Sequence, residues 1–161
     1  MMNPNTGSEF AFLFGTWTVA HQRLRHRLQG SDIWDRFQGS STTRPVLDGL
    51  GNVEENLIEH PDGTYRAIAI RSFDQSTGQW AIWWLDGRNP HHLDTPVVGQ
   101  FSDGIGTFTC EDTFEGRPIL VRFLWQCSSE TECHWEQAFS PDGGATWETN
   151  WLMDFTRSER D

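Results

Sequence analysis

The chain has 161 residues, of which 36% are hydrophobic and 22% are charged, as expected for one globular domain with its own core. A formal net charge of −11 at pH 7 argues against a nucleic acid or an anionic membrane as partner, because phosphate binding requires basic patches. All 12 basic residues are arginine, and the lack of lysine excludes Schiff-base chemistry and a phosphate-loop lysine.

Short alternating runs of apolar and polar residues, separated by turn sequences, fill the chain after a short segment at residues 8–13. The turns PDG, DQSTG, DG, EG and SPDGGAT each interrupt an alternating run. The pattern predicts ten strands, at residues 16–28, 32–44, 51–59, 64–73, 79–86, 96–102, 105–114, 117–127, 132–139 and 146–156. Antiparallel strands at hairpin spacing predict a single all-β domain over residues 1–161, an up-and-down β-barrel of about 8–10 strands, with a β-sandwich as the alternative.

Hairpins in the second half of the chain agree on one inner face. Folding about the DG and EG turns places Phe108 opposite Gly99 on one side and Phe123 on the other. Folding about the SET sequence after the eighth strand places Trp125 opposite Trp135. A slip of one residue in any hairpin would destroy this agreement, so we expect these residues to face the interior.

Two hairpins have longer turns. Folding the first hairpin about Gly30 places His21 opposite Gly39. Folding the last hairpin within its DGG sequence places Trp135 opposite Trp151. Indoles from the last three strands are therefore expected to converge on one shared space.

The strands at 51–59, 64–73 and 79–86 are harder to orient, because both of their faces carry apolar residues. We expect the interior face to be the one that contains Ala67 and Ala69, since two small residues opposite bulky neighbours leave unfilled space. That face consists of Asn52, Glu54, Asn56, Tyr65, Ala67, Ala69, Arg71, Trp80, Ile82 and Trp84. The alternative interior consists of Val53, Leu57, Ile68, Ile70, Ala81, Trp83 and Leu85.

The sequence FGTW, at residues 14–17, places a Gly-x-Trp motif at the start of the first strand and resembles the lipocalin signature. In lipocalins and the wider calycin group this tryptophan caps the closed end of the barrel, and an arginine near the last strand stacks on it. The resemblance implies that Trp17 is the cap and Arg157 its partner. The patterns F-x-x-G-x-W and D-G-G-x-T-W are also similar to bacterial lipocalin-like domains of unknown function.

The sequence SPDGGATW, at residues 140–147, matches the Asp-box pattern S-x-D-x-G-x-T-W found in the hairpin turns of sialidase-type propellers. A propeller would repeat the box in each blade, and here it occurs once. We therefore interpret Asp142 as a residue that forms a turn.

A barrel of this size either fills its interior with side chains or keeps a cavity for one small ligand. Glycines at 39, 99 and 106 favour a cavity, and we predict cytoplasmic binding of a small apolar or aromatic molecule inside it. The expected ligand-binding residues are Phe37, Trp84, Phe108, Phe123, Trp125, Trp135 and Trp151, with Gln137 and Thr149 as polar groups that orient the ligand.

The alternative function is a cofactor-independent enzyme, such as an isomerase, lyase or cyclase, that uses the same cavity. His21 and Glu54 would transfer a proton, and Arg71 would hold a carboxylate or stabilise an oxyanion. These three residues can equally form a structural network inside the barrel, since buried charges must be paired. A third interpretation, a structural module such as a homodimer, predicts a packed interior and an exposed apolar patch.

The sequence points to no metal and no cofactor. His21 and His26 lie on opposite faces of one strand, and no cysteine pair has zinc spacing. The start of the chain does not resemble a secretory signal, and no run approaches the ~18 apolar residues of a membrane span. Cys110, Cys127 and Cys133 suit free thiols in the cytosol, with a disulfide between the last two as the alternative.

Overall fold

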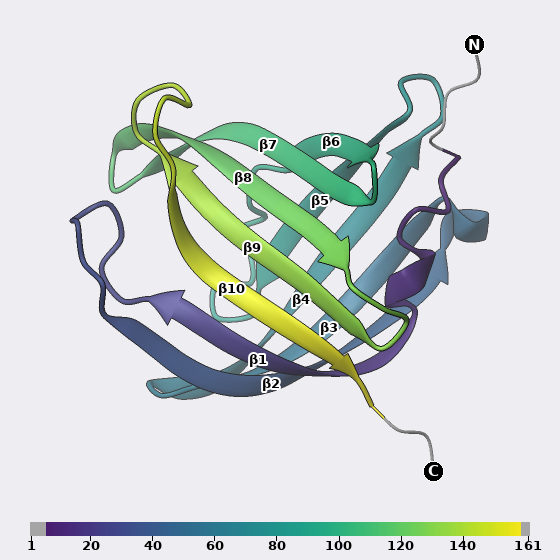
Figure 1. Ribbon diagram of the computed structural model, residues 1–161, viewed down its shortest axis with the longest axis horizontal. Coiled ribbons are helices and arrows are strands. Elements are labelled where there is room, and N and C mark those ends of the chain that lie inside the picture. Colours follow the sequence, from purple (N-terminus) through teal and green to yellow (C-terminus); the bar gives the residue numbers. More distant parts are fainter. Residues whose placement is uncertain (1–5, 159–161) are drawn as a thin grey trace.

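The sheet of this protein closes on itself. The computed structural model describes residues 6–158 and shows ten antiparallel strands, each paired with its neighbour in sequence, with the last strand lying beside the first (Figure 1). The strands are β1 (Gly15–Leu24), β2 (Trp34–Val46), β3 (Gly51–His60), β4 (Gly63–Asp74), β5 (Gln79–Asp86), β6 (Val97–Ser102), β7 (Ile105–Phe114), β8 (Arg117–Cys127), β9 (Glu132–Ser140) and β10 (Glu148–Arg157). Two 3₁₀ turns, η1 (Ala11–Leu13) and η2 (Leu47–Gly49), accompany them. The predicted all-β up-and-down barrel is confirmed.

The orientation predicted for β3, β4 and β5 is also confirmed. Ala67, Ala69 and Trp80 are only 3%, 2% and 1% exposed, and the polar residues expected on the same face are buried as well. The small alanines on β4 let larger side chains from other strands approach the sheet, which is why this face turns inward.

The hairpins folded about the DG, EG and SET sequences have the predicted register. Phe108 pairs with Gly99 and with Phe123, and Trp125 pairs with Trp135. The β6–β7 turn has positive φ at both central residues, as a type I′ turn requires, and this geometry leaves one register only. A Cβ atom at Gly99 would lie 1.8 Å from the carbonyl oxygen of Thr107, so this strand position accepts glycine alone.

The registers predicted for the two hairpins with longer turns are wrong by two residues. His21 pairs with Phe37 rather than Gly39, because β1 ends at Leu24 and a wider loop follows it. In the last hairpin Trp135 pairs with Met153 rather than with the predicted tryptophan. A shift of two residues keeps every side chain on its face, so the prediction of inside and outside survives in both hairpins.

The Asp-box sequence explains the longer turn between β9 and β10. The Ser140 hydroxyl accepts a hydrogen bond from the Gly144 amide at 2.8 Å and donates one to the Asp142 carboxylate at 2.8 Å. The Asp142 carboxylate also accepts hydrogen bonds from the amide and hydroxyl of Thr146. These side chains satisfy the backbone of the loop, as expected for the turn-forming role of Asp142.

A bulge in β10 changes one predicted position. Thr149 pairs with Ala138 and Trp151 with Gln137, so Asn150 is an extra residue between them. The Thr149 hydroxyl lies 3.4 Å from the carboxylate of Glu136 on the outer face, and Asn150 is fully buried instead. Alternation alone placed Thr149 inside because it assumed an unbroken ladder.

One end of the barrel is closed by a tryptophan and an arginine. Trp17 is completely buried, and the guanidinium carbon of Arg157 lies 4.2 Å from the centre of its ring. Arg157 donates hydrogen bonds to the backbone carbonyls of Phe12, Phe14 and Glu130 at 2.8, 2.7 and 3.1 Å. The pairing implied by the resemblance to lipocalins is therefore present, and the guanidinium ties the start of the chain to its last strand.

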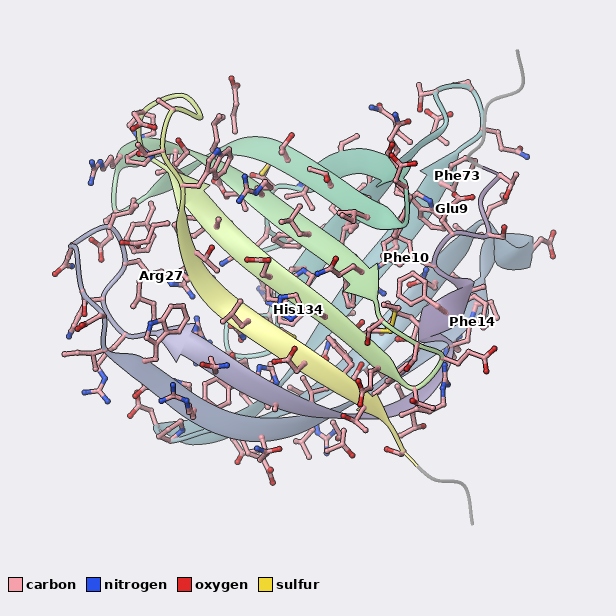
Figure 2. All side chains as sticks on the ribbon, viewed as in Figure 1. Glu9, Phe10, Phe14, Arg27, Phe73 and His134 are labelled. Carbon is pink, nitrogen blue, oxygen red and sulfur yellow. A yellow bond between two sulfur atoms is a disulfide. The ribbon has the colours of Figure 1, made fainter. Side chains whose placement is uncertain are left out.

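The segment before β1 adds aromatic side chains to this closed end. The Phe10 ring lies 4.9 Å from Trp80 and 5.0 Å from Phe101, measured between ring centres, and the Trp80 indole donates to Glu9 at 3.0 Å. Figure 2 shows that Phe10 and Arg27 lie at opposite ends of the barrel. The end that carries Arg27 has no such plug.

The cysteines differ from the expectation. Cys127 and Cys133 face each other across β8 and β9 and form a disulfide, so the prediction of free thiols is wrong for this pair, whereas Cys110 is free. The cysteine count therefore no longer argues for a reducing compartment, and cytoplasmic localisation stays a prediction. Neither helical turn of the described chain has the length or apolar character that a membrane crossing requires.

Candidate functional site

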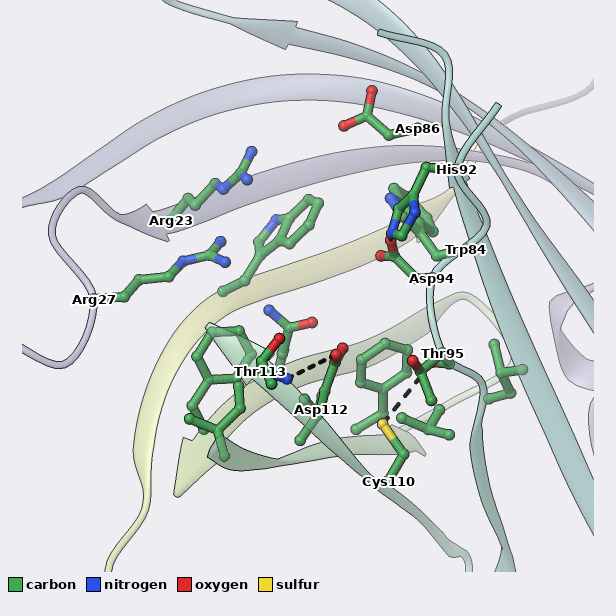
Figure 3. A pocket seen from close by; sticks show the side chains of 18 of the residues that line it. Arg23, Arg27, Trp84, Asp86, His92, Asp94, Thr95, Cys110, Asp112 and Thr113 are labelled. Carbon is green, nitrogen blue, oxygen red and sulfur yellow. Dashed lines mark hydrogen bonds and ion pairs between the residues drawn. The ribbon is translucent and has the colours of Figure 1, made fainter. Parts of the chain in front are cut away.

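A cavity of about 250 Å³ lies inside the barrel at the end opposite the Trp17 cap (Figure 3). Its wall is aromatic and apolar, and its mouth is charged. The aromatic side chains of the wall are Tyr65, Trp84, Phe123, Trp135, Phe139 and Trp151. The charged and titratable groups near the mouth are Arg23, Arg27, Asp86, His92, Asp94, Cys110 and Asp112.

The aromatic rings of the wall pack edge to face. Trp135 lies 5.4 Å from Trp151 and 5.0 Å from Phe123, and Trp84 lies 5.8 Å from Trp151, with interplanar angles of 87°, 78° and 85°. Each ring is held by the next, which fixes the shape of the wall without filling the space between strands. Flat faces and edges around one hollow suit a planar apolar ligand.

Five of the nine residues expected to bind a ligand line this cavity: Trp84, Phe123, Trp135, Gln137 and Trp151.

The other four expected residues lie elsewhere. Trp125 borders a smaller and deeper space of about 20 Å³, the size of one water molecule. Phe37 stacks on His21 at 4.8 Å, and Phe108 packs against Phe10 at the closed end. Thr149 faces outward because of the bulge in β10.

The three residues expected to act in catalysis are all buried but are not assembled as one group. Arg71 donates to the Glu54 carboxylate at 2.7 Å and to the Asn52 side chain at 2.8 Å, and Asn56 donates to the second Glu54 oxygen at 2.8 Å. The side chains of Arg71 and Glu54 are only 2% and 3% exposed. Each charge thus has a partner, which is the structural network that buried ions require.

His21 belongs to a different set of contacts. Its Nδ1 accepts a hydrogen bond from the indole of Trp151 at 3.1 Å, which leaves the ring proton on Nε2. Burial, followed by the charges of Arg23 and His60, lowers the pKa of His21 to about 4. No hydrogen bond joins His21 to Glu54 within residues 6–158, so His21 is a neutral side chain that positions Trp151.

Two arginines reach the mouth from the end of β1 and the loop after it. The guanidinium of Arg23 lies 4.6 Å from the centre of the Trp151 ring and donates to the Tyr65 hydroxyl at 3.2 Å. The guanidinium of Arg27 lies 5.4 Å from the centre of the Phe139 ring. Burial, followed by repulsion from Arg23, lowers the pKa of Arg27 to about 10.

The opposite side of the mouth is acidic. Asp86 is bonded to Arg88 at 2.7 Å, whereas burial and the charges of Asp112 and Asp86 raise the pKa of Asp94. Burial, followed by the charges of Asp112 and Asp94, raises the pKa of the Cys110 thiol to about 11. The mouth therefore has a cationic side and an anionic side.

Sequence reasoning missed the mouth residues because they lie in loops or at strand ends, where alternation gives no orientation. The signal that could have found them is the run of arginines at 23, 25 and 27, the densest cationic run of the chain. Among the described residues no three histidine, cysteine or acidic side chains converge as metal ligands would.

The barrel and its plug define the fold of the chain. A closed antiparallel barrel with a tryptophan and arginine plug at one end and an apolar cavity at the other has the lipocalin-like, or calycin, fold. The chain is similar in structure to the S-type phycobiliprotein lyase CPES from Guillardia theta, with a TM-score of 0.60 and 9% sequence identity over 94% of this chain and 92% of the lyase. No protein-family model matches the chain, and no curated protein matches it at the level of sequence.

Proposed function

We propose that the chain binds a small, planar and largely aromatic molecule in the cavity at the open end of the barrel. The observation that carries this proposal is the cavity of about 250 Å³, whose wall consists of aromatic rings that brace one another. The phycobiliprotein lyase of similar fold supports a barrel that handles a small molecule. The resemblance to bacterial lipocalin-like domains rests on the patterns F-x-x-G-x-W and D-G-G-x-T-W and stays a prediction.

Within residues 6–158 no hydrogen bond joins His21 to Glu54, as proton transfer between them would require. The proposal is therefore one of binding. Glu54 and Arg71 neutralise each other, and neither lines the main cavity. Both residues line the deeper space of about 20 Å³, which is too small for a substrate.

A titration with 2-naphthamide, a neutral bicyclic probe, tests the proposal. We expect saturable quenching of tryptophan fluorescence, because Trp84, Trp135 and Trp151 surround the cavity. Bound probe should also protect Cys110, the free cysteine of the described chain, from methyl methanethiosulfonate.

A matched pair of variants locates the binding. Val121 lines the cavity and Val98 is 40% exposed on the outer face of β6. Val121→Phe should weaken 2-naphthamide binding at least about tenfold by occupying the space, and Val98→Phe should leave it unchanged. Absence of saturable quenching and of Cys110 protection in the unaltered protein would overturn the proposed function.

A further inference from the structure

Neither of the two arginines at the mouth forms an ion pair in the described part of the chain. Within residues 6–158 the ion pairs of arginine involve Arg25, Arg71 and Arg88, and none involves Arg23 or Arg27. The Nη2 atom of Arg27 is buried without a hydrogen-bond partner in the same part of the chain. A buried donor of this kind is expected to have a partner, and no group of residues 6–158 supplies one.

The aromatic wall holds both guanidinium groups in a way that leaves donors free. Arg23 lies over the ring of Trp151 and Arg27 over the ring of Phe139. A contact between a cation and an aromatic face uses none of the N–H donors of the guanidinium group as a hydrogen bond. Arg23 gives one nitrogen to Tyr65, and its other nitrogens are available at the cavity.

The charges around the mouth favour an anion at one side of it. Figure 3 shows Arg23 and Arg27 side by side, with Asp86 and Asp94 across the cavity from them. Repulsion between two neighbouring guanidinium groups is relieved when an anion lies between them, and carboxylates on the far side repel that anion toward them.

The outer surface of the same rim adds no further unpaired arginine. A second hollow of about 390 Å³ adjoins the cavity through Arg23 and Arg27 and is bordered by Arg25 and Arg88 together with Asp35, Asp62 and Glu115. Arg25 is paired with Asp35 and Arg88 with Asp86, so the unpaired positive charge among the lining residues of this hollow comes from Arg23 and Arg27. Two neighbouring positive charges attract an anion to one place on a chain whose net charge is −11.

We propose that the ligand is a planar aromatic molecule with an oxyanion, a carboxylate or a phosphate, which Arg23 and Arg27 bind together at the mouth. The ring system lies in the aromatic cavity, and the oxyanion accepts hydrogen bonds from the two guanidinium groups. This inference rests on the proposed function and names the chemical class of its ligand. Arg71, which the sequence suggested as the residue that holds a carboxylate, is already bonded to Glu54, so Arg23 and Arg27 take this role in its place.

Three probes that share one ring system test the inference: 2-naphthamide, 2-naphthoate and 2-naphthyl phosphate, titrated by isothermal calorimetry. We expect at least one of the two anions to bind about tenfold tighter than the neutral amide, with an affinity that falls as salt rises. The tighter anion distinguishes a carboxylate ligand from a phosphate ligand.

Variants of the arginines assign the effect to residues. Arg27→Gln and Arg23→Gln should each remove most of the tenfold preference, so that the anions and 2-naphthamide bind with similar affinity. Arg25→Gln is the matched control, because Arg25 follows the same strand but is paired with Asp35 outside the cavity. Circular dichroism and thermal unfolding check that each variant is folded.

The outcomes separate the two proposals. Equal affinity for the amide and both anions, or an equal loss in Arg25→Gln and Arg27→Gln, would overturn the inference and leave the proposed function standing. Failure of all three probes to bind would overturn the proposed function and the inference with it.

Discussion

Arg157 and Arg27 occupy opposite ends of one barrel and have opposite surroundings. Arg157 lies over an indole and donates to three backbone carbonyls. Arg27 lies over a phenyl ring, and its Nη2 has no partner among the described residues. The same side chain thus holds the fold together where its donors are satisfied, and is available for a ligand where they are not.

The closed half extends this contrast into the barrel. Arg71 lies over Phe10 and Trp125 at 4.9 and 5.2 Å and forms its ion pair with Glu54. The buried charges of Arg71 and Glu54 are paired with each other, whereas the mouth keeps positive and negative groups apart. We therefore expect variants of the closed half to change stability and variants of the mouth to change binding.

The largest expected effect comes from breaking the buried ion pair. Arg71→Met should lower the free energy of unfolding by about 4 kcal/mol, because Glu54 is left buried without its countercharge. Urea denaturation followed by tryptophan fluorescence measures this loss. The double variant Arg71→Met/Glu54→Gln should recover a large part of it, and a loss below about 1 kcal/mol in the single variant would contradict the contrast.

Removing the guanidinium of the plug should come next. Arg157→Ala should cost about 3 kcal/mol, because three backbone carbonyls lose a charged donor and Trp17 loses its cover. Arg25→Ala is the control, since its exposed pair with Asp35 should contribute about 1 kcal/mol or less. Equal losses in the two variants would remove the special role of the plug.

Acid should weaken the fold through His21. Its pKa is about 4 in the folded protein against 6.5 for the free side chain, so the unfolded chain binds the proton more readily between these values. Stability from this residue is therefore present above pH 6.5 and is lost as the pH falls, by about 2 kcal/mol between pH 7 and pH 5. His21→Gln should flatten urea midpoints across this window and the exposed His91→Gln should not. An unchanged profile in His21→Gln would refute the assignment.

The smallest expected effect on stability is at the mouth. Arg27→Met should change the free energy of unfolding by no more than about 0.5 kcal/mol, because it removes a charge that lacks a partner and keeps an apolar chain. The same urea measurement applies. A loss comparable to that of Arg157→Ala would show that Arg27 is structural and would erase the difference between the two ends.

Alternation and two-residue turns were sufficient to predict most of the fold. The inner face of β6, β7 and β8 follows from turns whose backbone permits one register. The longer loops after Leu24 and after Ser140 hid the register of two hairpins, because their lengths depend on side-chain hydrogen bonds within the loop. The bulge at Asn150 left no trace in the sequence pattern.

Of the residues that form the candidate site, the sequence predicted only those that lie on strands. Trp84, Trp135 and Trp151 were assigned to the cavity from the faces of their strands, and they line it. Arg27 and Asp94 lie outside strands, where the path of the backbone rather than a period decides where a side chain points. The partners of Arg71 and His21 depend on contacts across the barrel, which one strand cannot reveal.

The pairing of β1 with β10 also has a consequence for synthesis of the chain. Arg157 follows Phe14 by 143 residues, which a ribosome needs roughly 7–30 s to add. Throughout that interval one edge of the first strand has no partner in the ring and is open to other chains. The edge of the first strand therefore stays open to aggregation until the ten residues of β10 emerge, and a helper that shields this edge would raise the yield of folded protein.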